Sequence, residues 1–193
     1  MPVKSAPAYQ ARLKQLYVNE IRPQLQKELG LANLHQVPRL EKIVVAVGTG
    51  RHKDDKSYHG VVVNTLRKIT GQQPVDRLSR KSIASFKIRA GQNRIGVSVT
   101  LRGDRMYEFF DRLVSVALPR VRDFHGVSLK SFDQSGNYSL GVADQSIFPE
   151  LTFEDIQTIH GLQITLVLKS AGVEHSRALL ARLGLPLEKE EKR

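Results

Sequence analysis

The chain of 193 residues contains no cysteine. It therefore forms no disulfide and offers no thiolate to a metal or a substrate, which excludes zinc ribbons, zinc knuckles and cysteine hydrolases. The chain also lacks any run close to the roughly 18 apolar residues of a membrane-spanning helix. Its longest apolar candidates, such as residues 162–168, have the length of a strand. We expect no segment to cross a bilayer.

Acidic residues are outnumbered by basic residues and are absent from one stretch. Lys and Arg number 30 against 19 Asp and Glu, which gives a formal net charge of +11 and a pI near 10.1. No Asp or Glu occurs between Arg77 and Arg102, a window that also holds Arg80, Lys81, Lys87, Arg89 and Arg94. Charges of one sign repel each other unless a polyanion neutralises them. The window therefore predicts binding to nucleic acid or to an anionic membrane surface.

The two ends of the chain carry little apolar sequence. Residues 1–7 contain no apolar signal region, so we expect neither secretion nor import and place the chain in the cytoplasm. The length suits one domain, to which we assign residues 1–187. Residues 188–193 have no apolar member and are predicted to be a disordered charged tail.

Hydrophobic periodicity predicts an alternation of helices and strands. Helices are expected over 9–29, from an N-cap at Ser57 to 69, from an N-cap at Asp104 to Pro119, and over 174–183. Pro23 either opens a second helix or kinks the first one. Strands are expected over 40–47 and 162–168, with a loop-rich segment over 124–141.

A β-hairpin is predicted between residues 82 and 101. Residues 82–89 and 95–101 alternate and are joined by a glycine-containing loop. In the second strand Ser98 and Thr100 lie on the face opposite to Val97 and Val99, so one face is core and the other is available to a partner. Because βαβ repetition is missing, we predict an α+β fold with a largely antiparallel sheet, helices packed on one face, and the other face available to RNA.

Little in the sequence predicts catalysis or a cofactor. The Gly48-Thr49-Gly50 turn lacks the third glycine of a dinucleotide-binding motif, and the six histidines lack metal-site spacing, so most are expected in loops or at the surface. The carboxylates Glu150, Glu154 and Asp155 are interpreted as charges at a helix start. We expect no enzyme activity, no catalytic residue, no cofactor, no metal and no small-molecule substrate.

The basic window favours RNA over a plain solvated surface. Its hydroxyl residues can donate to phosphate oxygens, and Phe86 offers a ring on which a base can stack. A buried Phe86 in the core is about equally expected, because aromatic residues in strands usually face inward.

Several blocks of sequence together resemble one family. They are residues 37–43, the turn at Gly48 and Gly50, and residues 69–74, 80–89, 99–110, 119–124, 131–138 and 148–150. In this order they are similar to the bacterial large-subunit ribosomal protein L5 family, over roughly residues 9 to 186.

The resemblance implies a structural protein in the central protuberance of the large subunit. Its implied partners are 5S rRNA, the P-site tRNA, other large-subunit rRNA and proteins, and protein thirteen of the small-subunit head, with no membrane. The implied rRNA-binding residues are Gln72, Ser98, Thr100 and Arg102. The implied tRNA-binding residues are Arg77, Arg80, Lys81, Ser82, Phe86 and Lys87. The implied intersubunit-bridge residues are Arg120, Arg122 and Asn137.

Two positions depart from the family pattern. Ala46 stands where an Asn is usual before the glycine turn, which removes one expected polar contact to rRNA. Arg77 stands where a hydroxyl residue is common, which adds a positive charge at a phosphate-facing position.

Two other classes of function remain as alternatives. A nuclease needs a cluster of carboxylates or histidines to hold a metal, and the acid-free window supplies none. A peripheral membrane protein would carry its cations on an amphipathic helix, whereas these cations lie on expected strands and loops.

Overall fold

The computed structural model describes residues 9–52 and 55–188, whose five strands form one antiparallel sheet in the order β2-β3-β1-β5-β4. The strands are β1 (Arg39–Gly48), β2 (Val75–Leu78), β3 (Arg94–Leu101), β4 (Tyr138–Val142) and β5 (Leu162–Lys169). The helices are α1 (Arg12–Leu16), α2 (Arg22–Glu28), α3 (Lys56–Thr70), α4 (Gly103–Arg112), α5 (Phe153–Ile156) and α6 (Val173–Arg182). This arrangement confirms the predicted α+β class.

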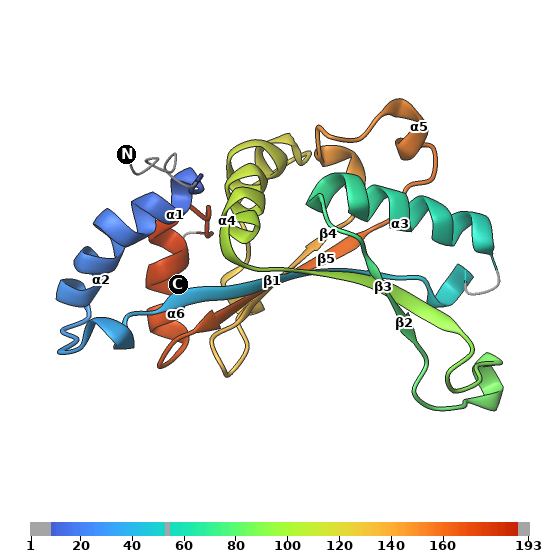
Figure 1. Ribbon diagram of the computed structural model, residues 1–193, viewed down its shortest axis with the longest axis horizontal. Coiled ribbons are helices and arrows are strands. Elements are labelled where there is room, and N and C mark those ends of the chain that lie inside the picture. Colours follow the sequence, from blue (N-terminus) through green and yellow to red (C-terminus); the bar gives the residue numbers. More distant parts are fainter. Residues whose placement is uncertain (1–8, 53–54, 189–193) are drawn as a thin grey trace, which may run out of the picture.

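The elements form two layers with an extension at each end. Figure 1 shows α3 and α4 against one side of the sheet. Helices α1, α2 and α6 gather at one end of the molecule, and the segment between β2 and β3 projects from the other end (Figure 1). We call this segment, residues 79–93, the arm.

The core lies between the sheet and the helix layer. Val45 of β1 is flanked by Val99 of β3 and by Ile164 of β5, and each of the three is at most 1% exposed. Leu66 of α3 and Phe109 of α4 belong to the same buried cluster. Because strand side chains alternate between faces, this burial directs the intervening residues to the opposite face of the sheet. Each such apolar side chain stabilises the fold by roughly 1.5–3 kcal/mol.

The predicted helices lie where the periodicity places them, but two of their caps differ. Asp55, and not Ser57, caps α3, because its carboxylate accepts a hydrogen bond from the backbone N–H of Ser57 at 2.9 Å. Arg102 occupies the N-cap position of α4. The predicted cap Asp104 lies in the first turn instead, 3.0 Å from Lys14. Lys14 of α1 thus engages the carboxylate that was predicted to cap α4.

The N-terminal helical segment runs through Pro23 without a break. A π-helical turn, Tyr17–Ile21, joins α1 to α2, and Pro23 lies in the first turn of α2. Proline removes one backbone donor and its ring crowds the carbonyl four residues earlier, so a wider turn at this place accommodates it. The hydroxyl of Tyr17 donates to the carbonyl of Pro38 at 2.9 Å and ties the turn to the start of β1.

The predicted strand over residues 82–89 is wrong. The partner of β3 is the short strand β2, with Val75 opposite Ser98 and Arg77 opposite Gly96. Residues 82–89 lie in the arm, which contains the 3-10 turn Ala84–Phe86. Alternation along a sequence does not identify a strand's partner. Residues 80–87 are all exposed, so their alternation does not separate a buried face from a solvent face.

Strand β4 was not predicted, because its residues fall in the segment expected to be loop-rich. It follows a turn in which Gly136 has φ 80° and is buried. Asn137 anchors this turn, because its side chain donates to Asp133 at 2.8 Å and accepts from the backbone N–H of Leu168 at 3.1 Å. The turn therefore packs firmly against β5 and the start of α6.

The packing of this turn makes Gly136 sensitive to substitution. A Cβ at this position would lie 2.5 Å from Ser176 Oγ and 2.7 Å from Ser170 Oγ. We predict that Gly136→Ala lowers the free energy of unfolding by about 2–4 kcal/mol, because it adds overpacking to an unfavourable φ. Urea unfolding measures this loss.

Gly141→Ala provides the matched control in the adjacent strand. A Cβ there meets no atom within 4 Å, and Gly141 has no positive φ. We expect this variant to stay within about 0.5 kcal/mol of the parent. Equal losses in the two variants would show that the turn is not docked on the two serines.

Candidate nucleic-acid interface

The face of the sheet opposite α3 and α4 carries small and polar side chains. Across the centre of this open face, Ala46 of β1 lies between Ser98 of β3 and Gln163 of β5. In the next row Val44 lies between Thr100 and Thr165. A shallow hollow of about 610 Å³ lies here, lined in part by Ala46, Gly48, Gly96, Gly161 and Gln163. Small residues at its centre let a ligand approach the backbone of the sheet.

Thr100 and Arg102 present polar groups at one end of the open face. Thr100 is half-buried and Arg102 is exposed directly after β3. Gln72 supports this end, because its amide donates to the carbonyl of Thr100 at 3.2 Å. Strand β2 pairs with β3 only as far as Ser98, so the Gln72 side chain satisfies a carbonyl beyond the last strand pair. Gln72 therefore orders the strand that carries Thr100.

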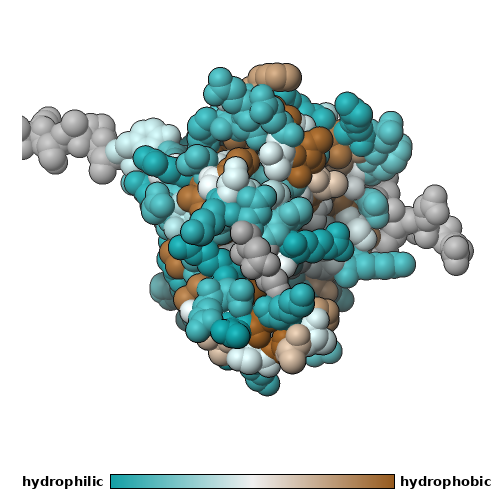
Figure 2. Space-filling model, turned by 90° about the vertical axis from the view of Figure 1, so that its right-hand side faces the viewer, coloured by the Kyte–Doolittle hydropathy of each residue, from teal (hydrophilic) through white to brown (hydrophobic). Residues whose placement is uncertain are grey.

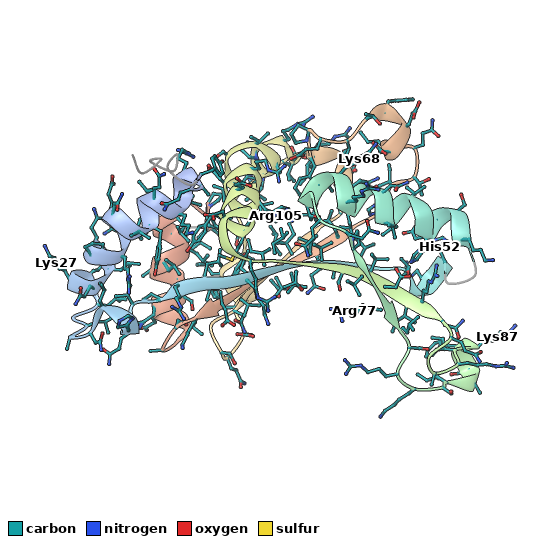
Figure 3. All side chains as sticks on the ribbon, viewed as in Figure 1. Lys27, His52, Lys68, Arg77, Lys87 and Arg105 are labelled. Atoms are coloured by element: carbon teal, nitrogen blue, oxygen red, sulfur yellow. The ribbon has the colours of Figure 1, made fainter. Side chains whose placement is uncertain are left out.

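Ser98 faces the open side but does not project from it as predicted. It is 5% exposed, and its hydroxyl accepts a hydrogen bond from Nε of Arg77 at 2.7 Å. The exposed Arg77 covers it and presents a cation in its place. Figure 3 shows Arg77 beside the sheet and Lys87 at the far tip of the arm. The structure thus separates Arg77 from the other residues predicted to contact tRNA.

The open face also includes residues that sequence reasoning missed. Gln163 and Thr165 project from β5, and Thr165 Oγ1 lies 3.3 Å from the hydroxyl of Ser139 on β4. Lys42 occupies the same face of β1, toward the end where Arg102 lies. The alternation of residues 162–168 signals two faces, but only the strand order shows that this strand borders β1.

The arm presents the remaining predicted tRNA-side residues. Arg80, Lys81, Ser82 and Lys87 are all exposed. Phe86 is 65% exposed, which excludes the alternative that its ring belongs to the core. Figure 2, which views the molecule from the arm side, shows a mostly hydrophilic surface interrupted by small hydrophobic patches. Such a surface offers cations together with a ring that a nucleic-acid base can stack on.

Carboxylates form ion pairs with some of the cations that lie outside the arm. Several outside the arm are paired with carboxylates: Arg12 with Asp111, Lys68 with Asp155, Arg112 with Glu150, and Arg182 with Glu28. Lys68 and Thr152 lower the pKa of Asp155 to about 2, which keeps that carboxylate charged.

No such pair forms in most of the acid-free window. Arg94 at the base of the arm pairs with Asp76 at 3.1 Å. Within residues 9–52 and 55–188, Arg80, Lys81 and Arg89 have no carboxylate partner. These three cations of the arm are therefore not offset by a described carboxylate, and a polyanion would neutralise them.

The three predicted bridge residues have different environments. Arg122 is exposed, whereas Arg120 donates to the carbonyl of Ile147 at 3.3 Å. Both line a hollow of about 860 Å³ between the 118–128 segment and β4. Asn137 does not line it. Its side-chain amide instead makes the two hydrogen bonds that hold the turn before β4. Only the two arginines are placed to meet a partner at this hollow.

The histidines and carboxylates of the described residues are spread over the fold. No group of three or more His, Asp or Glu residues among the described residues could hold a metal ion. Asp155 and Thr152 form a capping box at α5, and Glu154 lies in the same first turn, as interpreted from the sequence. His160 is an exception to the expected surface histidines, because it is 4% exposed and its burial lowers its pKa.

Two further features of the described residues concern the glycine turn at residues 48–50 and the question of a membrane-spanning helix. The backbone N–H of Thr49 donates to the carbonyl of Ile95 at 3.0 Å, so the glycine turn continues the pairing of β1 with β3 past the end of β1. Across residues 9–52 and 55–188, every helix is too short or too polar to span a membrane.

The sequence matches two family models that together cover most of the chain. Residues 33–89 match the model described as "Ribosomal protein L5", and residues 94–187 match the model of the C-terminus of the same ribosomal protein family. The first of these spans includes β1 and most of the arm, and the second includes β3, β4 and β5.

Individual bacterial proteins are similar along nearly their whole length. A "Large ribosomal subunit protein uL5" of Anaeromyxobacter sp. (strain K) is 57% identical over 176 residues, or 91% of this chain and 97% of the relative. Proteins of the same name from Acidobacterium capsulatum and Desulforamulus reducens are 53% and 48% identical. These two alignments cover 91% and 93% of this chain and 96% and 98% of the respective relatives.

Proposed function

Because the chain belongs to the ribosomal protein L5 family, we propose that it anchors 5S rRNA in the large subunit through the open face of its sheet. Family membership makes it a structural, non-enzymatic component of the large ribosomal subunit. The proposal goes further and assigns 5S rRNA to the open face, the P-site tRNA to the arm, and protein thirteen of the small-subunit head to the Arg120–Arg122 hollow.

One observation carries the 5S rRNA assignment: the open face combines a flat floor of small residues with hydroxyls and cations at its ends. Thr100 and Arg102 lie at one end, and Arg77, which is opposite Gly96 toward the other end, reaches over Ser98 in the central row. Sugars, phosphates and unstacked bases can meet such a face, whereas the narrow major groove of an RNA helix does not admit side chains.

The two departures from the family pattern lie together on this face. Ala46 pairs with Ser98, and Ser98 accepts the hydrogen bond of Arg77. Ala46 and Arg77 also line the same hollow. The side chain of Ala46 makes no polar contact to 5S rRNA, and we propose that the guanidinium of Arg77 makes one beside it. We therefore assign Arg77 to the 5S rRNA surface of the open face and not to the tRNA surface of the arm.

Substitutions at the end of β3 test the 5S rRNA assignment. We expect Arg102→Ala to weaken binding of isolated 5S rRNA at least tenfold, because it removes a charge-assisted hydrogen bond of roughly 1.5–3 kcal/mol. The log-log dependence of affinity on salt should become less steep by about 0.7–0.9, the value of one phosphate contact. Thr100→Val should also weaken binding. Filter binding across a salt series measures both quantities.

Two control variants separate the open face from general charge. Arg67→Ala removes the same charge from α3 in the helix layer, and Arg80→Ala removes it from the arm. Both should bind 5S rRNA within about twofold of the parent, since exposed charges away from an interface contribute little. Equal weakening by Arg102→Ala and Arg80→Ala would show that the two surfaces are wrongly assigned.

The arm is suited to the tRNA because it projects from the sheet and carries several exposed cations together with an exposed ring. Lys87 lies at its tip, and Phe86 is exposed next to it. Base stacking on an aromatic ring contributes roughly 1–3 kcal/mol per base. A tRNA held here would be contacted through its backbone by Arg80 and Lys81 and through a base or ribose by Phe86.

Variants of the arm are expected to affect tRNA and spare 5S rRNA. In ribosomes that carry the protein, Phe86→Ala should increase the dissociation rate of P-site tRNA about tenfold, through the loss of stacking. Phe86→Leu keeps an apolar side chain without a π-face and should show nearly the same increase. If Phe86→Leu behaves like the parent, the ring does not stack. Replacing Arg80 and Lys81 together by Ala should weaken tRNA retention and reduce its salt dependence.

For the proposed contact with the small-subunit protein, the predicted bridge residues have two different roles: Arg122 meets the partner, and Asn137 stabilises the fold. Arg122 is exposed beside the hollow, so Arg122→Ala should weaken association of the two ribosomal subunits without destabilising the protein. Asn137→Ala should instead lower the free energy of unfolding by about 1–3 kcal/mol, because it leaves the backbone N–H of Leu168 without its acceptor. Sucrose-gradient sedimentation and urea unfolding distinguish the effects. A folded Asn137→Ala protein of normal stability that fails to bridge would contradict this division.

A further inference from the structure

The arm contains no acidic residue that could pair with its own cations. No Asp or Glu occurs between Arg77 and Arg102, so no carboxylate within this window can hold the cations of residues 79–93 together. Like charges on a short loop repel each other and favour an extended loop. A carboxylate introduced to hold them would also cancel the charge that attracts a polyanion. Neutral hydrogen bonds are therefore the available means of folding the arm.

Ser79 makes three such bonds at the base of the arm. Its backbone N–H donates to the carbonyl of Asn93 at 2.9 Å, and its carbonyl accepts from Gly91 at 2.8 Å. Its hydroxyl donates to the carbonyl of Arg89 at 2.5 Å. Ser79 is 5% exposed, although most residues of the arm are exposed. A buried serine with all its polar groups engaged contrasts with the solvated surroundings.

Asn93 completes the closure on the same residue. Its side-chain oxygen accepts a hydrogen bond from the backbone N–H of Arg89 at 2.7 Å. Both backbone polar groups of Arg89 are thus bound by side chains of Ser79 and Asn93. The positions of Ser79 and Asn93 are themselves set by β2 and β3, which directly precede and follow the arm. The base of the arm is in this way a continuation of the sheet.

The tip of the arm is folded by a second set of bonds. Ile83 and Ile88 exchange backbone hydrogen bonds of 2.9 and 3.1 Å, and the hydroxyl of Ser82 accepts from the backbone of Ala90 at 3.0 Å. Lys87 closes the turn with φ 51° and ψ 41°, a left-handed conformation that non-glycine residues rarely adopt. Such a conformation persists where the surrounding bonds determine it.

We infer that the arm is a folded element of the free protein and that Ser79 is the positioning residue that locks it. The lock explains how cations can be presented at fixed places without a neighbouring acid. A binding element that is ordered beforehand avoids the entropy cost of ordering a loop on its partner. The reason given for an ordered arm rests on its proposed role in RNA binding. The order of the arm itself is measurable without RNA.

Amide hydrogen exchange of the full chain tests the lock. In the parent protein the amides of Gly91, Ala90 and Ile88 should be protected, because their acceptors lie within the arm. Ser79→Ala removes only the hydroxyl and should accelerate exchange of these amides roughly three- to tenfold, the effect of one hydrogen bond. The amides that join β3 to β1 should exchange as in the parent.

Ser85→Ala is the matched control. Ser85 is an exposed serine of the same arm whose side chain makes no hydrogen bond to the described residues. Exchange of the arm amides in this variant should equal that of the parent. Unprotected arm amides in the parent, or equal rates in the parent and in Ser79→Ala, would overturn the inference.

Asn93→Ala decides the case in which Ser79→Ala unfolds the whole protein. It removes the other side-chain bond to Arg89. Acceleration confined to the arm in this variant supports the lock, and unchanged exchange overturns it. Failure of the parent to bind tRNA would contradict the proposed tRNA contact and leave the exchange result to decide whether the arm is locked.

Discussion

Burial of one face of the sheet is the constraint from which the other features of this protein follow. Val45, Val99 and Ile164 lie side by side beneath α3 and α4, and this row fixes the register of three strands. Because side chains alternate at every residue, a shift by one position would bring Ala46 and Ser98 into the core. The approach of Gly96 to the carbonyl of Val47, where a Cβ would lie 3.0 Å from the oxygen, reinforces the same register. The open face is thus a direct consequence of how the core is packed.

The distribution of ion pairs gives this two-sided sheet its electrostatic character. Lys68 and Arg112 in the helix layer have carboxylate partners, which fix these two cations to neighbouring segments. The arm has cations without such partners and is folded instead by the neutral groups of Ser79, Ser82 and Asn93. Charge that is not used for folding is available to a polyanion. This separation fits a structural component of the large ribosomal subunit, which must be stable by itself and also bind RNA.

Much of the fold was predictable because it depends on local pattern. The β-branched alternation of β1, β3 and β5 and the apolar periodicity of α3 and α4 correctly indicated these elements. Strand β2 and the arm were not predictable in this way. Residues 82–89 alternate as a strand does, but hydrogen bonds across the loop fold them into a turn. The cap of α3 was misplaced for a similar reason, since Asp55 and Ser57 are equally suitable in sequence and only the backbone geometry selects one.

The sequence by itself determined the family, the α+β class and the sign of the partner's charge, because motif order, periodicity and the absence of acids are properties of the chain alone. Only the tertiary structure decided which polar residues are hydrogen-bonded within the fold and which are presented on its surface. It placed Ser98 beneath Arg77, committed Asn137 to a turn, and brought Gln163 of β5 to the same face as Thr100. These assignments depend on which strands are neighbours and which side chains compete for one hydrogen-bond partner. Neither property is encoded at a fixed distance along the sequence.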